Sequence, residues 1–61
     1  MSIVDYLNSD FVLDKKFLLG EIKFSLSKKL TLDEAKIFFA CGYKLTGLKS
    51  TKYFTAYTFK K

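Results

Sequence analysis

Apolar and polar residues alternate most clearly at residues 21–27. Ile22, Phe24 and Leu26 alternate with polar residues, so that the two kinds of side chain fall on opposite faces of an extended chain. This period of two is typical of a strand with one face in a core and one face in water. We therefore expect a half-buried strand here.

The pattern changes to a helical one at residues 32–41. Thr31 suits the N-cap, and Glu34 stands three residues later, which forms the sequence signature of a capping box. Gly42 is placed to end the helix in a left-handed conformation. Because residues 37–41 are apolar on every side of the helix, we expect the last turn to be buried nearly all round.

Beyond this helix the residues favour strands again. Residues 43–48 and 52–60 are rich in Tyr, Phe, Thr and Leu, and 49–51 form a short connection, which together predict a C-terminal hairpin. Gly47 marks a bulge or a close approach between strands. One face of the last strand would carry Tyr53, Thr55, Tyr57 and Phe59. Since both faces carry aromatic residues, one set is expected to be exposed or to pack on a partner.

The first twenty residues contain weaker signals. Ser2 and Asp5 suggest a short N-terminal helix that ends near Leu7. Residues 11–19 are predicted as a second helix that stops at Gly20, although 11–13 are equally compatible with an extended chain. The expected fold is a single α+β domain over 1–61, with short N-terminal helical segments, a strand, helix 32–41 and a C-terminal β-hairpin, the small antiparallel sheet packed on the helix.

Charge is distributed unevenly along the chain. Residues 1–34 carry five lysines and six acids, a net charge of −1, whereas residues 35–61 carry six lysines and no acid, which together give the net charge of +5. Seven of the eleven aromatic residues also lie in the second part. Aromatic residues between lysines indicate a surface for an anionic partner. Lysine bias of an AT-rich genome is the alternative explanation for the excess charge.

Nucleic acid is the first partner that this composition suggests, with the C-terminal hairpin as the binding surface. Lysines would hold phosphates and exposed tyrosines would stack on bases. The candidate residues are Lys44, Lys49, Lys52, Tyr53, Tyr57, Lys60 and Lys61. The chain has no arginine, and lysine is a point charge without the bidentate fork that reads base edges, so binding is expected to be weakly specific or non-specific. The tyrosines have core or dimer packing as their alternative role.

The element order is also compatible with a winged-helix or reduced helix-turn-helix layout, and residues 30–35 resemble the opening of such a segment. Residues 43–51 would then form the recognition helix, but their composition favours a strand. A different hypothesis is a regulatory protein of viral or mobile-element type. It would inhibit a host protein by docking an aromatic sheet face or strand edge on an acidic surface.

Other classes of function have little support. Histidine is absent, and the carboxylates Asp33 and Glu34 are explained by helix capping, so we expect neither an enzyme nor a metal or cofactor site. The lone cysteine, Cys41, is expected to be a buried small hydrophobe, as are its neighbours Phe38 and Phe39. A single thiol and the lack of a secretory signal favour the cytoplasm. No membrane association is expected, because the longest apolar run, residues 37–41, is far too short to span a membrane. A homodimer is a further expectation, formed along the edge of the last strand.

Overall fold

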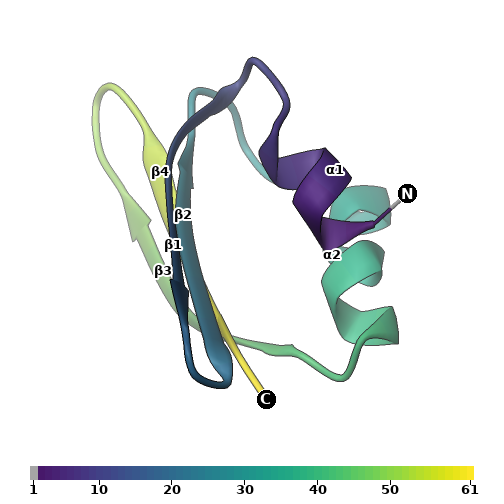
Figure 1. Cartoon of the computed structure of the whole chain (residues 1–61). Helices are drawn as coiled ribbons and strands as arrows, with labels where there is room; N and C mark the ends of the chain where they lie inside the picture. The colour runs from purple at the N-terminus through teal and green to yellow at the C-terminus, as the bar shows by residue number, and fades with distance from the viewer. Residues whose placement is uncertain (1) are drawn as a thin grey trace.

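The chain forms a four-stranded antiparallel sheet with two helices on one side, as Figure 1 shows. The computed structural model describes residues 2–61. Its elements, in chain order, are α1 (Ile3–Leu7), β1 (Val12–Leu18), β2 (Glu21–Leu26), α2 (Leu32–Ala40), β3 (Lys44–Ser50) and β4 (Thr55–Lys60). The expected α+β class, the strand at 21–27, the helix after Thr31 and the C-terminal hairpin are confirmed.

The last strand lies inside the sheet. The strand order is β1-β2-β4-β3, so β4 pairs with β2 on one side and with β3 on the other. Edges are left only at β1 and β3, and each of these strands has a register irregularity, near Leu13 in β1 and near Thr46 in β3. The edge that was expected to support a homodimer therefore does not exist at the last strand. Bulges at an edge also disfavour pairing with a further strand.

The core between the sheet and the helices is largely aromatic. Phe38 of α2 stacks on Phe59 of β4, with ring centroids 4.4 Å apart, and on Phe24 of β2 at 5.1 Å. Tyr6 of α1 meets the rings of Phe38 and Phe24 edge-on. Since each aromatic side chain buries on the order of 150–250 Å², these rings supply most of the bulk that so short a chain can place in a core.

The predicted second helix at residues 11–19 is wrong, because Val12–Leu18 form strand β1. β1 is an edge strand with little cover, and apolar residues point to both of its sides. The bulge at Leu13 also interrupts the alternation of its side chains. A clean period of two is therefore absent from the sequence, although Val12 still pairs with the buried Leu26.

The last turn of α2 is less buried than predicted. Phe38 is fully buried, but Phe39 keeps 45% of its surface exposed. Cys41 is the exposed C-cap and contributes nothing to the core, contrary to expectation. The helix ends at Ala40, and Gly42 adopts a φ of 87°, which confirms its predicted role in stopping the helix.

The C-terminal hairpin turns later than predicted. β3 extends to Ser50, so residues 51–54 form the connection, where the Thr51 hydroxyl accepts hydrogen bonds from the backbone of Tyr53 and Phe54. Gly47 lies beside the predicted bulge, and a Cβ at this position would stand 3.1 Å from the Cβ of Thr58. Because residues 44–50 are a strand, no recognition helix follows α2, and the helix-turn-helix layout does not apply.

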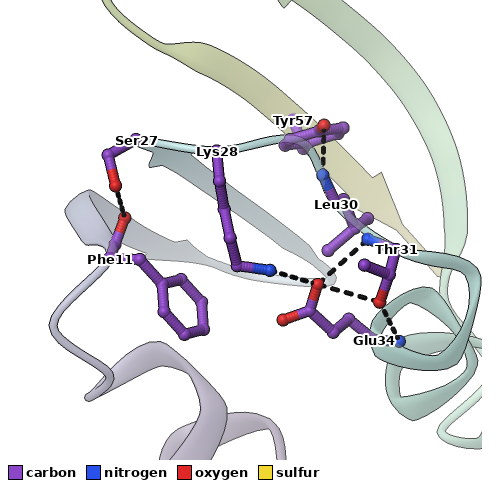
Figure 2. Close-up of polar contacts among 7 residues, drawn as sticks. All are labelled: Phe11, Ser27, Lys28, Leu30, Thr31, Glu34 and Tyr57. Carbon is purple, nitrogen blue, oxygen red and sulfur yellow. Dashed lines mark hydrogen bonds and ion pairs between the residues drawn. The ribbon is translucent and has the colours of Figure 1, made fainter.

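Glu34 closes the N-terminus of α2, as Figure 2 shows. Its Oε1 accepts hydrogen bonds from the backbone and hydroxyl of Thr31, both at 2.9 Å, and from Lys28 Nζ at 2.6 Å. The Thr31 hydroxyl accepts a hydrogen bond from the backbone of Glu34, which completes the capping box. Above this network the backbone of Leu30 donates to the hydroxyl of Tyr57, which ties the helix to β4.

These contacts predict a loss of stability in acid. Partial burial acts to raise the pKa of Glu34, but the hydrogen bonds from Lys28 and Thr31 outweigh it and hold the pKa below its ordinary value of 4.5. A folded-state pKa that is lowered gives stability that is present above pH 4.5 and is lost as the pH falls through the folded value. Urea unfolding from pH 6 to pH 2 measures this loss.

Glu34→Gln is the control, because glutamine also fits a capping box but carries no charge to titrate. The variant should be less stable than the wild type by about 1 kcal/mol at pH 6. The difference between the two proteins should vanish at low pH. A difference that stays constant with pH would contradict the role of the carboxylate.

Candidate nucleic-acid interface

The side of the sheet away from the helices carries a set of side chains that we call the open face. The strand register places them together, since cross-strand partners point to the same side of a sheet. The residues of the open face are Asp14, Lys16 and Leu18 of β1, Glu21, Lys23 and Ser25 of β2, Ala56, Thr58 and Lys60 of β4, and Lys44, Gly47 and Lys49 of β3. None of them is aromatic.

Lysines oppose each other directly on this face. Lys16 of β1 is the cross-strand partner of Lys23, and Lys44 of β3 is the partner of Lys60. Directly opposite side chains have Cβ atoms about 4.5–5.5 Å apart, and like charges at such positions destabilise a sheet. The folded chain therefore holds positive charges together at two places where folding alone would favour an acid or a neutral residue.

Most of this positive charge lacks a carboxylate partner. In the described part of the chain, the only ion pair of an open-face lysine joins Lys23 to Glu21 at 3.6 Å. Asp14 is the other acid on the face, and its Oδ1 accepts a hydrogen bond from the backbone of Lys15. The lysines without an ion pair here are Lys16, Lys44, Lys49 and Lys60. The face keeps a clear positive excess.

The side chains at the centre of the open face are small and leave a hollow. Ser25, Ala56 and Thr58 line a hollow of about 180 Å³, and the charged residues at this hollow are Lys16, Lys23 and Asp14. Two lysines against one carboxylate leave it with a positive excess. Gly47 continues the run of small residues toward β3. Lysines on the β1–β2 side and on the β3 side thus stand on either side of small residues. An extended anion can approach the backbone of the sheet closely between these two groups.

The helix side carries a more balanced charge, because Glu34 pairs with Lys28 and Asp33 with Lys36. Asp33 and Glu34 lie at the start of α2, and Asp5 lies on α1. A cavity of about 290 Å³ between the helices is lined by Tyr6, Ser9, Phe11, Asp33, Glu34 and Ile37. Burial, with the nearby Glu34 carboxylate, raises the pKa of Tyr6 well above its ordinary value, so its hydroxyl keeps its proton. Two carboxylates and no lysine line this cavity, so it is unsuitable for an anion.

The residues predicted from the sequence are separated by the structure. Lys44, Lys49 and Lys60 lie on the open face. Lys52 and Tyr53 lie in the turn beyond it, where Lys52 Nζ stands 5.9 Å from the Tyr53 ring. The other two predicted residues are not part of the open face. Tyr57 is in the core, and Lys61 Nζ stands 5.1 Å from the ring of Tyr43.

Tyr57 cannot stack on a base in this fold. Its ring is 6% exposed and packs against Phe24 with centroids 5.6 Å apart, and its hydroxyl accepts the hydrogen bond from Leu30. Tyr53 is the exposed tyrosine of the predicted pair, at 79%. Core packing, which was the alternative role considered for these tyrosines, applies to Tyr57.

Two open-face lysines were not among the residues predicted from the sequence. Lys23 occupies a polar position in the alternating segment, so the sequence predicts that its side chain faces water. The alternation does not reveal that another lysine lies opposite it. Lys16 fell within the predicted helix 11–19, which assigned it to no face. The two lysine pairs lie on the same face because β1 and β2 belong to the same sheet as β3 and β4. The basic surface therefore combines residues from both parts of the sequence.

No helix within residues 2–61 has the length and apolar character needed to cross a membrane. Over the same range, His, Cys, Asp and Glu side chains do not form a group of three or more that could hold a metal ion. In comparisons with known proteins, the chain gave no match to a protein-family model, to a curated protein or to a solved structure.

Proposed function

We propose that the protein binds nucleic acid through the phosphate backbone, with the open face as the contact surface. The observation that supports this most directly is the pair of like-charge contacts, Lys16 with Lys23 and Lys44 with Lys60. A polyanion placed between such lysines would relieve their repulsion. Nucleic acid supplies a dense, regular array of negative charge, about one per 1.7 Å of duplex axis.

The dimensions and chemistry of the face agree with this proposal. Four strands span about 14 Å from β1 to β3, and the lysine rows extend about 13 Å along the strands, which corresponds to a few phosphates. Lysine attracts phosphate without reading base edges, so the binding should be largely independent of sequence. The protein would act by covering or organising nucleic acid, with no chemical step required.

Salt dependence tests the proposal. Binding of labelled oligonucleotides, followed by fluorescence anisotropy, should show a slope of log K against log salt near −3.6 if about four phosphates are neutralised, each contributing about −0.9. Affinity should then fall on the order of 10²-fold between 50 and 200 mM salt. Failure to bind any oligonucleotide at 50 mM salt would overturn the proposal.

A host protein remains the second candidate partner, with a changed docking surface. The aromatic face of the last strand is covered, because Phe59 is fully buried. Leu45 and Leu48 of the edge strand β3 are exposed by 44% and 63%, and Phe39 of α2 is also partly exposed. Polyglutamate is the discriminating ligand. If it binds as tightly as an oligonucleotide of equal charge, an acidic protein surface becomes the better interpretation.

A further inference from the structure

The turn between β1 and β2 carries apolar residues that the fold does not use. Leu19 is fully exposed, and Leu18 is exposed by 42%. Hairpin turns normally carry Asn, Asp or Gly, and Gly20, with a φ of 70°, already supplies the flexible position here. Leu18 and Leu19 together form an exposed apolar tip that is available to a partner.

The tip is held in a defined position. The backbone of Lys61 donates a hydrogen bond of 2.9 Å to the carbonyl of Gly20, which ties the turn to the end of the chain. Leu18 lies on the open face, opposite Glu21 and in the same cross-strand row as Lys60 and Lys44. The apolar tip therefore stands at one end of the surface that carries the lysines.

The open face lacks the groups that hold unpaired bases. Proteins that bind single strands combine a basic groove with aromatic rings on which bases stack. In the described chain, the floor of the open face consists of Ser25, Ala56, Thr58 and Gly47, and no ring lies on it. Lysines on both sides of this floor are suited to two phosphate backbones that flank a groove.

We propose that the nucleic acid is duplex DNA, which lies with its minor groove on the open face, and that Leu18 and Leu19 insert between base pairs as a wedge. This inference rests on the proposed function. Proteins that bind the minor groove often insert Leu, Phe, Ile or Met at a base step and bend the duplex by about 20–90°. The small floor would allow the groove to approach closely, while the lysines hold the phosphates on both strands.

A bending measurement on a short duplex tests the wedge. Fluorescence resonance energy transfer between dyes at the two ends of a 25-base-pair duplex should rise when the wild-type protein binds. Leu18→Ser with Leu19→Ser should keep affinity for this duplex within about 10-fold, since lost apolar contact is offset by the base stacking that is no longer disrupted. The rise in energy transfer should be lost.

Val4→Ser is the matched control, because Val4 is 59% exposed on α1 and lies on the helix side. It should bend the duplex as the wild type does. A duplex with one mismatch, which is already easy to unstack, should bind the wild type about 10-fold more tightly than the perfect duplex. The double serine variant should lose this preference.

The outcomes separate the wedge from the proposed function. If the wild type binds duplex DNA with the expected salt dependence but does not bend it, the wedge is wrong and phosphate binding stands. Equal or tighter binding to single-stranded DNA or duplex RNA would overturn duplex DNA as the substrate. If no oligonucleotide binds, both proposals fail together.

Discussion

Phe38→Ala is expected to leave most of the chain unfolded at 25 °C. Phe38 is fully buried, with its ring 4.4 Å from that of Phe59 and 5.1 Å from that of Phe24. Removal of a buried phenylalanine ring costs about 3–5 kcal/mol, whereas stability on the order of 0.05–0.15 kcal/mol per residue leaves a domain of this size only a few kcal/mol. Far-UV circular dichroism and urea unfolding measure the loss.

The neighbouring residue offers a matched control. Phe39→Ala makes the same chemical change one position along α2, where the ring is 45% exposed and only tilts against Phe59 at 6.0 Å. Its effect should be about 1 kcal/mol or less, since nearly half of its surface is already in contact with water. Equal losses for the two variants would show that α2 does not face the sheet as described.

Local sequence patterns were sufficient to predict the elements that depend least on contacts with distant parts of the chain. The capping box at Thr31 and Glu34 and the left-handed Gly42 set the ends of α2 through contacts within a few residues. The alternation at 21–27 marked β2 because this strand lies in the middle of the sheet, with one face fully covered. In both cases the pattern and its cause lie in the same short segment.

The remaining features depend on neighbours that are distant in sequence. β1 is an edge strand, so Phe17 and Leu18 remain half exposed on opposite sides and no periodic pattern results. The insertion of β4 between β2 and β3 cannot be deduced from residues 55–60 alone. This insertion buries Tyr57, and together with β1 it brings Lys16 and Lys23 to the same face as the C-terminal lysines.

Neutralising lysines on the open face should weaken nucleic-acid binding far more than neutralising lysines elsewhere. In a triple variant with Lys16→Gln, Lys44→Gln and Lys49→Gln, three phosphate contacts are lost. The slope of log K against log salt should become shallower by about 2.7, and affinity at 50 mM salt should fall on the order of 10²–10³-fold. The fold should be retained, because these side chains are exposed and two of them repel an opposite lysine.

The control is a second triple variant of equal charge, with Lys29→Gln, Lys36→Gln and Lys52→Gln. Lys36 is on α2, with only a loose ion pair to Asp33 at 3.8 Å, and the other two lysines are in loops. If net charge alone attracted the nucleic acid, the two variants would lose affinity equally. If the open face is the contact surface, the control variant should lose less than about 10-fold in affinity and keep most of the salt dependence. Its free energy of unfolding should not exceed that of the first variant, because the first variant is relieved of two like-charge contacts. The contrast between Lys49 and Lys52 is the sharpest part of this comparison, because they are only three positions apart in the hairpin and only Lys49 lies on the open face.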